Sequence, residues 1–184
     1  MDTRVNTKIF LKTVFLFPLF MIFIMFPLCV LIVITAFLPK GRVLATKLYE
    51  FFGWIGIVLV GVELNIIGAE KIDPKKSYVV IGNHPSTLDI FTHITALPVS
   101  IRFLTKTELF RIPIFGRVLK TLGLPRIDRK NAKANFEKIN DSINQVIKLG
   151  NSIMIFPEGK RSNQKELLPF KKGASHIAKN FNLP

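Results

Sequence analysis

The sequence predicts an α/β fold, a mixed sheet flanked by helices, preceded by an N-terminal membrane helix or helix pair. From residue 62 onward, short apolar runs alternate with stretches of helical periodicity. A long uncharged apolar run lies before them, and residues 131–149 carry apolar side chains at the spacing of an amphipathic helix. We therefore divide the 184 residues into a membrane-anchoring segment, 1–61, and a domain, 62–184.

The first apolar run, residues 14–38, is 25 residues long and contains no charged residue. As a helix it would be roughly 37 Å long, enough to cross the hydrocarbon core of a bilayer. A cleaved signal peptide is the alternative, but the run is long for one and no small-residue cleavage pattern follows. We therefore expect a retained anchor, kinked at Pro18 and Pro27.

A second uncharged stretch, residues 51–62, is too short to span a membrane as a helix. It is either a helix returning along the membrane surface, for which Tyr49 and Trp54 are suitable, or a part of the domain core. Basic residues flank the first run on both sides, so the positive-inside rule does not set its orientation.

The elements of the domain follow from local patterns. Alternating polarity predicts a half-buried strand at 62–66, and the valine-rich run 78–81 predicts a buried strand that ends at Gly82. The remaining expected elements are a helix at 87–97, a strand at 101–104, one or two short helices between 108 and 122, a strand at 124–127, a helix at 131–149, a strand at 152–156 and a helix at 172–181.

Composition narrows the function. The chain is 49% hydrophobic and carries a formal charge of +14, which together favour a membrane surface or a polyanionic ligand. Nucleic acid is the competing polyanion, but no zinc spacing, RNP-type aromatic motif or basic-region heptad is present, so no nucleic-acid partner is expected. A single cysteine, Cys29, excludes an intrachain disulfide framework.

Residues 82–89 follow a predicted strand and open a predicted helix, which is where ligands bind in open α/β sheets. His84 can accept a hydroxyl proton near neutral pH, and the carboxylate of Asp89 could fix its tautomer and stabilise the imidazolium. Helix capping is the alternative role for Asp89, because Ser86 and Asp89 have the spacing of a capping box.

A zinc site is a further alternative, because Asp89 and His93 share a helix face and His84 could join them. No cysteine or further histidine lies nearby to complete the ligand set, so we expect no metal.

Residues 156–162 follow another buried strand and are expected at the same edge of the sheet as His84. Gly159 permits close backbone approach, and Lys160 and Arg161 offer charge to a phosphate, although a solvated turn is also possible. A third block, residues 124–130, belongs to a basic region that predicts a phosphate site, a membrane-facing surface or simply a solvated face.

Together these blocks resemble the glycerolipid acyltransferase family, the 1-acylglycerol-3-phosphate acyltransferases in particular. The family pattern Asn-His-x4-Asp is present at 83–89, an apolar-Asp pair followed by arginine at 127–129, and Phe-Pro-Glu-Gly-x-Arg-Ser at 156–162. A further similar stretch lies at 106–116. The order and spacing of these blocks make the resemblance, which covers residues 62–184, highly specific.

The resemblance implies transfer of a fatty acyl group from acyl-CoA or acyl carrier protein to the 2-hydroxyl of 1-acylglycerol-3-phosphate, giving phosphatidic acid in phospholipid biosynthesis. His84 would deprotonate the hydroxyl and Asp89 would orient His84, with no acyl-enzyme, metal or organic cofactor. The substrate-binding residues that the resemblance implies are Lys106, Arg126, Arg129, Glu158, Gly159 and Arg161. Another lysophospholipid acceptor, or an anionic-lipid-binding protein without catalysis, remains the alternative.

The resemblance also implies contact with membrane lipids, and a place at the inner or cytoplasmic membrane with the domain on the cytoplasmic side. The family usually continues into a fourth block, an apolar strand that contains proline, whereas this chain stops at Leu183 and Pro184. We therefore expect a domain that is incomplete at its C-terminal end, with exposed sheet edges.

Overall fold

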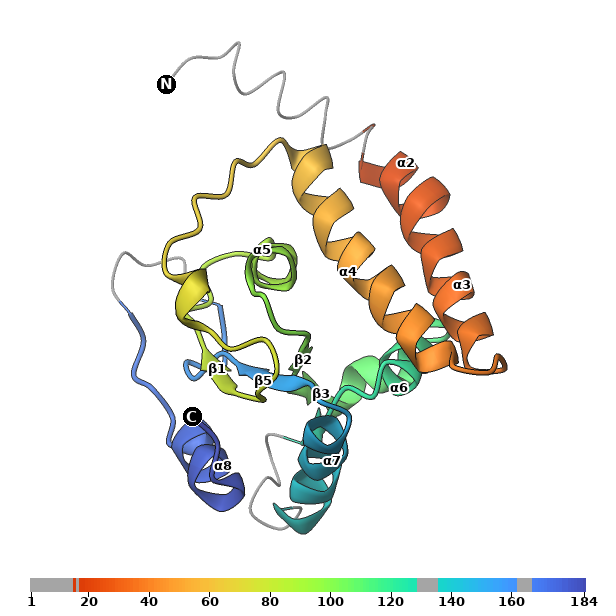
Figure 1. Cartoon of the computed structure of the whole chain (residues 1–184). Coiled ribbons are helices and arrows are strands. Elements are labelled where there is room, and N and C mark those ends of the chain that lie inside the picture. Colours follow the sequence, from red (N-terminus) through yellow and green to blue (C-terminus); the bar gives the residue numbers. More distant parts are fainter. Residues whose placement is uncertain (1–14, 16, 129–135, 162–166) are drawn as a thin grey trace, which may run out of the picture.

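The computed structural model describes residue 15 and residues 17–128, 136–161 and 167–184 (Figure 1). Their helices and strands are, in chain order, α2 (Phe17–Phe20), the π-helix η2 (Met21–Met25), α3 (Phe26–Thr35), α4 (Gly41–Val60), the 3₁₀ helix η3 (Ala69–Lys71), β1 (Val79–Ile81), α5 (Asp89–Ala96), β2 (Ile101–Phe103), β3 (Thr105–Lys106), the 3₁₀ helix η4 (Thr107–Arg111), α6 (Phe115–Thr121), β4 (Arg126–Ile127), α7 (Phe136–Lys148), β5 (Ser152–Ile155) and α8 (Gly173–Phe181).

The main sheet has three parallel strands in the order β1-β5-β2. Every residue of the central strand β5 is buried, because helices cover both faces (Figure 1). Met154 packs into a cluster with side chains of α3, α4, α5 and α6. Ile153 and Ile155 point to the opposite face, where they pack with α7 and α8.

A second, two-stranded parallel sheet extends this arrangement. β3 follows β2 directly, and its Thr105 and Lys106 pair with Arg126 and Ile127 of β4. The predicted α/β class with flanking helices is confirmed, and all strand pairings among the described residues are parallel.

The predicted strand at 62–66 is wrong, because none of these residues takes part in a β-ladder. Val62 and Leu64 are half-buried and Glu63 and Asn65 are exposed, so the alternation that suggested a strand is real. Alternating burial shows that one side of a segment faces the protein, but a strand also requires a neighbouring strand to pair with.

The first membrane run forms α2, η2 and α3, and its predicted irregularity is confirmed. The π-helix η2 ends immediately before α3, in whose first turn Pro27 lies. Pro27 has no backbone N–H to donate to the carbonyl of Phe23, so the regular helical ladder is interrupted there.

The second apolar stretch belongs to a longer helix than the sequence predicted. α4 begins at Gly41, ten residues before the uncharged stretch, and its 20 residues are enough to span a membrane. Ala45 and Tyr49 are buried in the core, whereas Trp54 and Val58 are about half exposed. α4 therefore packs into the core on one face, as the second alternative predicted, and presents an apolar surface on the other, while its path along a membrane stays a prediction.

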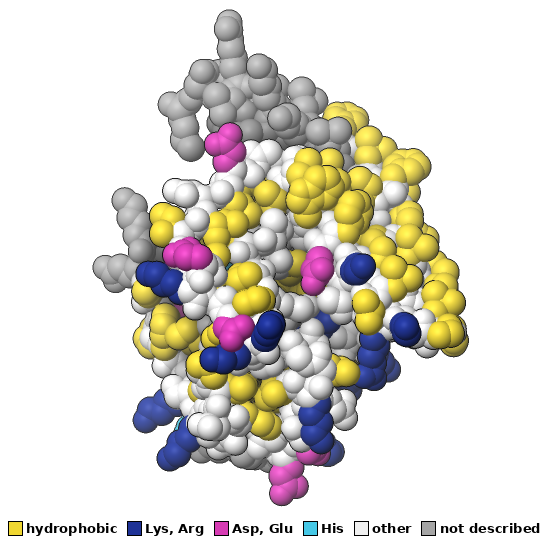
Figure 2. All heavy atoms as spheres, viewed as in Figure 1, with side chains coloured by type: hydrophobic (Ala, Val, Ile, Leu, Met, Phe, Trp, Pro, Cys, Tyr) yellow, Lys and Arg dark blue, Asp and Glu magenta, His cyan; other side chains and the backbone are white. Residues whose placement is uncertain are grey.

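Two segments are long and apolar enough to cross a membrane. Pro18–Thr35 has a mean hydropathy of 2.7 and is 18% buried, and Gly41–Val60 has a mean hydropathy of 1.6 and is 28% buried. Hydrophobic side chains form an extended band over these helices, whereas Lys and Arg side chains gather mainly elsewhere on the face shown (Figure 2). A patch of this extent is typical of a surface that contacts a membrane or another protein.

The N-terminal helices also share a core with the sheet. Leu28 and Ile32 of α3 lie in one buried cluster with Ile101 and Phe103 of β2. Side chains from residues before and after the predicted boundary at residues 61 and 62 therefore pack together. The division into an anchoring segment and a separate domain stays a prediction.

Close packing fixes α4 against α5. A Cβ atom on Gly53 would collide with Ile94, and one on Gly56 would collide with the ring of Phe91. Only glycine permits this approach, which places the apolar helix directly against the helix that begins with Asp89.

Arg102 links β2 to α4 and to the end of α6. Its side chain is almost fully buried and donates to the carbonyl of Leu122 at 2.8 Å and to Thr46 Oγ1 at 2.7 Å. The guanidinium also lies 5.3 Å from the ring centroid of Tyr49. Burial lowers the pKa of Arg102, while Tyr49 and Glu50 oppose that shift.

Candidate active site

The candidate site lies at the carboxyl edge of the three-stranded sheet, where β1 and β5 end. His84 follows β1 by three residues, and the segment 156–159 follows β5 directly. Because β1 and β5 are parallel neighbours, both segments reach the same edge, as the sequence predicted.

His84 and Asp89 are in direct contact. His84 Nδ1 lies 2.7 Å from Asp89 Oδ2, and both side chains are mostly buried. A carboxylate can only accept a hydrogen bond, so Nδ1 carries the proton and Nε2 keeps a lone pair. The pair therefore presents Nε2 as a base, with its tautomer set by Asp89.

Asp89 also satisfies the turn before α5. Its Oδ2 accepts the backbone N–H of Ser86 at 2.9 Å, and Ser86 Oγ accepts the N–H of Leu88 at 3.1 Å. The sequence left capping and pairing with His84 as alternatives. Asp89 Oδ2 pairs with His84 and also accepts the N–H of Ser86, but α5 begins at Asp89 itself, so the predicted capping box with Asp89 at the third helical position does not form. The bond to Ser86 orders the turn that brings His84 to Asp89.

Glu158 connects the two blocks across the sheet. Its side chain is buried, and its Oε1 accepts the backbone N–H of His84 at 2.8 Å. The sequence assigned Glu158 to substrate binding, whereas this contact makes it a residue that positions His84.

Phe156 supports the imidazole, a role that the sequence analysis missed. The rings of His84 and Phe156 are stacked, with centroids 4.0 Å apart and planes 7° apart. Phe156 in turn packs on Phe103 at 5.7 Å. The position of Phe156 in the sequence could have indicated this role. It is the first residue after a buried strand, so it lies at the same edge of the sheet as the turn that contains His84.

His93 has a structural contact rather than one with His84. Its Nδ1 lies 2.6 Å from the carbonyl oxygen of Asp89, one helical turn earlier. Its Nε2 faces Gly82, where an added Cβ would lie 2.7 Å away. Within the described ranges, no group of three or more His, Cys, Asp or Glu side chains is placed to hold a metal ion.

The basic end of the 156–162 block lies over the turn that carries His84. The exposed side chain of Arg161 donates from Nη1 to Thr87 Oγ1 at 2.5 Å. Gly159 has a φ of +74°, and an added Cβ there would lie 2.8 Å from Lys171 Nζ. Lys171, whose backbone N–H donates to Pro157 at 2.9 Å, was not recognised as a site residue from the sequence.

The other predicted phosphate-binding residues lie along β3 and β4. Lys106 is exposed at the end of β3, and Arg126 stacks over the ring of Phe110 at 4.3 Å. In the described part of the chain, no hydrogen bond or ion pair joins either of them to His84. Arg129 lies outside the described residues.

Comparisons with known proteins agree with these motifs. The sequence profile of a family described as Acyltransferase matches residues 63–184. A 1-acyl-sn-glycerol-3-phosphate acyltransferase of Cocos nucifera is 35% identical over 147 residues, which are 79% of this chain and 47% of that protein. The enzyme of the same name from Saccharomyces cerevisiae is 34% identical over 69% of this chain and 42% of its own length.

A crystal structure of a 1-acyl-sn-glycerophosphate acyltransferase, PlsC, from Thermotoga maritima has a similar fold. The two structures superpose with a TM-score of 0.72 at 24% sequence identity, covering 100% of this chain and 73% of that one. This chain spans about half the length of the curated relatives it matches. The family profile covers most of the chain and includes all three motif blocks, so this protein belongs to the glycerolipid acyltransferase family.

Proposed function

We propose that the protein transfers a fatty acyl group from a thioester donor to the 2-hydroxyl of 1-acylglycerol-3-phosphate, giving phosphatidic acid. The observation that carries this proposal is the His84–Asp89 pair, which leaves His84 Nε2 as a base at the carboxyl edge of the sheet. The names of the relatives support the choice of acceptor.

In the proposed reaction, His84 Nε2 removes the proton of the acceptor hydroxyl as the hydroxyl oxygen attacks the thioester carbonyl. The resulting tetrahedral intermediate collapses, the carbon–sulfur bond breaks, and the imidazolium returns its proton to the leaving thiolate. An ester replaces the thioester, and the enzyme ends in its starting state. Asp89 stabilises the imidazolium, and the family resemblance implies direct attack without a covalent acyl-enzyme. A base and positioning suffice for this step, because a thioester is already activated.

The surroundings of His84 hold it in place for this step. Glu158 holds its backbone, Phe156 holds its ring and Asp89 holds Nδ1. These three contacts restrict both the position and the rotation of the imidazole, so little reorganisation is needed when a substrate binds.

An apolar cavity next to the site is suitable for the hydrocarbon part of a substrate. It has a volume of about 150 Å³ and lies where α3, α4 and α6 meet the sheet. Its wall includes Phe103, which packs on Phe156, and Ile90, which follows Asp89 in the chain. A chain entering this cavity would place its polar end near His84.

The two long apolar helices support a reaction at a membrane, and the family resemblance implies that the catalytic edge is on its cytoplasmic side. The helices expose large apolar side chains and also pack against α5 and the sheet. The acyl chain of a lysolipid would then enter the site from the bilayer.

The experiment that tests this function is an acyl-transfer assay with the membrane-reconstituted protein. It compares acyl-CoA with acyl carrier protein as donors, and 1-acylglycerol-3-phosphate with lysophosphatidylcholine and lysophosphatidylethanolamine as acceptors. We expect transfer to the phosphate monoester acceptor in preference to the others. Lipid binding without transfer to any acceptor would favour the alternative of a non-catalytic lipid-binding protein.

The position of Arg161 leads to a prediction about the acceptor phosphate. Arginine can grip a phosphate through two parallel hydrogen bonds, whereas lysine offers a point charge. Arg161→Lys should therefore raise the KM for 1-acylglycerol-3-phosphate by about tenfold or more while changing the donor KM little. Steady-state kinetics with each substrate varied in turn checks this, and Arg129→Lys should behave in the same way.

Lys172→Gln is a suitable control, because Lys172 is exposed at the start of α8 and has no contact with His84. A rise in the donor KM alone for both arginine variants would show that these arginines contact the coenzyme A or carrier-protein part of the donor and not the acceptor phosphate.

A further inference from the structure

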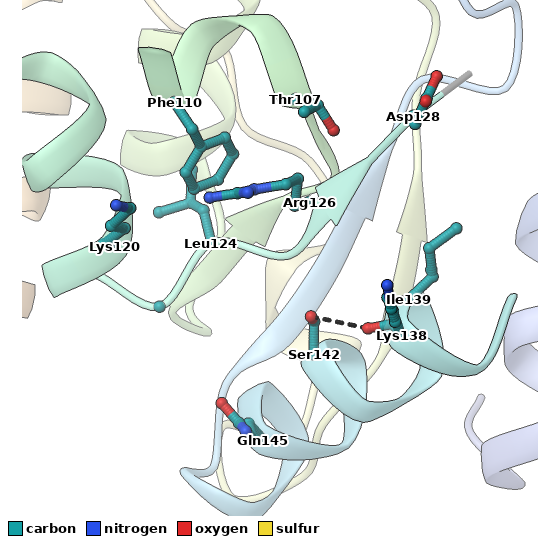
Figure 3. Close-up of a pocket in the computed structure, with 11 residues that line it drawn as sticks. Thr107, Phe110, Lys120, Leu124, Arg126, Asp128, Lys138, Ile139, Ser142 and Gln145 are labelled. Atoms are coloured by element: carbon teal, nitrogen blue, oxygen red, sulfur yellow. Dashed lines mark hydrogen bonds between the residues drawn. The ribbon is translucent and has the colours of Figure 1, made fainter. Parts of the chain in front are cut away.

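A polar cleft lies between β4 and α7, separate from the contacts around His84. Its volume is about 540 Å³ (Figure 3). One wall comes from η4, α6 and β4 and includes Thr107, Phe110 and Arg126, and the facing wall is the side of α7 with Lys138, Ser142 and Gln145 (Figure 3). A cleft of this size accommodates a small organic ligand rather than a single ion.

Cationic side chains from three different elements line this cleft. Lys120 comes from α6, Arg126 from β4 and Lys138 from α7, and Asp128 is the one acidic side chain among the lining residues. Within the described ranges, none of the three cations forms a salt bridge. Three cations against one carboxylate leave the lining with a net positive charge, so the cleft is suited to an anion.

The arginine is held in a fixed orientation. The guanidinium of Arg126 lies 4.3 Å from the centroid of Phe110, and its side chain runs along that ring toward Lys120 (Figure 3). The stacking restricts the guanidinium plane and leaves its edge free to donate hydrogen bonds. Thr107, Ser142 and Gln145 add polar side chains around the same space.

A short chain of contacts links the cleft to His84. His84 stacks on Phe156, which packs on Phe103 at the end of β2. Thr105 lies two residues further on, about 7 Å along the strand, and Arg126 is its partner across the ladder, about 5 Å away. This chain of contacts sets an upper limit on the separation, so the cleft is close enough to His84 for one extended ligand to reach both places.

We propose that this cleft binds the phosphates at the nucleotide end of coenzyme A, and so selects acyl-CoA as the donor. The proposal rests on the proposed function, because it concerns the donor of that reaction. In acyl-CoA a long flexible arm separates the thioester from a diphosphate and a 3′-phosphate, so its reactive and anionic ends bind at separate places. Three cations match this polyanion, and the half-buried Leu124 offers apolar surface to its base.

The proposal also separates the basic residues into two groups. Arg161 lies over the turn that carries His84, where the phosphate of a short acceptor can reach it. Arg126 lies in the cleft with Lys120 and Lys138. The proposal therefore assigns Arg126 to the donor rather than to the acceptor.

The first experiment measures binding without turnover. Coenzyme A is titrated into wild-type protein and into the double variant Lys120→Gln/Lys138→Gln by calorimetry. Each lost contact between a cation and a phosphate should weaken binding by about tenfold. Lys148→Gln is the matched control, because Lys148 is on α7 and exposed but does not line the cleft. Equal affinity of wild type and double variant would overturn the proposal, whether or not acyl transfer is observed.

The second experiment compares donors. The double variant should raise the KM for acyl-CoA by about tenfold or more but leave kcat/KM for S-acyl-pantetheine, which lacks the nucleotide, as in wild type. An equal loss of kcat/KM with both donors would show that the cleft residues maintain the structure of the active site and do not bind the nucleotide. An equal loss of affinity for inorganic pyrophosphate and coenzyme A would make it a general anion site. A raised KM for acyl carrier protein alone would make it a protein-docking surface, and each of these results would overturn the proposal.

Discussion

Replacing His84 with alanine is expected to reduce turnover about 100-fold or more, the usual scale for losing a general base. Nε2 is the proposed proton acceptor, and the described residues offer no equivalent base in the same position. His93, whose ring packs edge-on against Phe156, directs Nδ1 to the carbonyl of Asp89 and Nε2 toward Gly82. The measurement is kcat with saturating acyl donor and acceptor in a membrane-reconstituted preparation.

The same substitution should change thermal stability little. The imidazole stacks on Phe156 and bonds to Asp89, but Glu158 accepts the backbone N–H of residue 84, which alanine retains. His176→Ala is the control for loss of an imidazole, because His176 is exposed on α8. A His84→Ala protein with near-normal turnover would show that another group accepts the proton, and the proposed mechanism would then be abandoned.

The sequence predicted the parts of this site that depend on strand order. Each chemical block follows an apolar run, and parallel neighbouring strands deliver such blocks to one edge. This reasoning placed His84 next to the segment 156–159, and the pairing of β1 with β5 confirms it. His84 and Asp89 are five positions apart, so the sequence could suggest their contact but could not distinguish it from capping, because both depend on the conformation of the intervening turn.

Other features depend on contacts that no local pattern records. The helix α4 extends through charged residues because one of its faces packs on α5, so the uncharged stretch alone underestimated its length. The segment 62–66 alternates like a strand but pairs with no strand among the described residues. Segments that are distant in the sequence form the surroundings of Phe156, Lys120 and Lys138. Phenylalanine and lysine are also too common for their presence alone to indicate a site.

Replacing Asp89 with asparagine is expected to leave the protein folded while reducing turnover about 100-fold or more. One oxygen of Asp89 accepts both the N–H of Ser86 and the Nδ1–H of His84. The amide oxygen of asparagine can also accept the N–H of Ser86, so it can preserve the turn and the melting temperature should change little.

Asparagine cannot, however, preserve the electrostatics of the Asp89–His84 contact. If its oxygen faces His84, the tautomer is kept but no negative charge stabilises the imidazolium. If its amino group faces His84 instead, Nδ1 must accept, Nε2 becomes protonated and the base is lost. Asp89→Ala is the comparison, because it removes the bond to the Ser86 N–H as well and should cost roughly 1 kcal/mol of stability in addition to turnover. Turnover and thermal denaturation measured on both variants separate the two roles. Normal turnover in Asp89→Asn, with lost stability in Asp89→Ala, would leave Asp89 with the bond to Ser86 alone, and His84 would then have to act without a carboxylate partner.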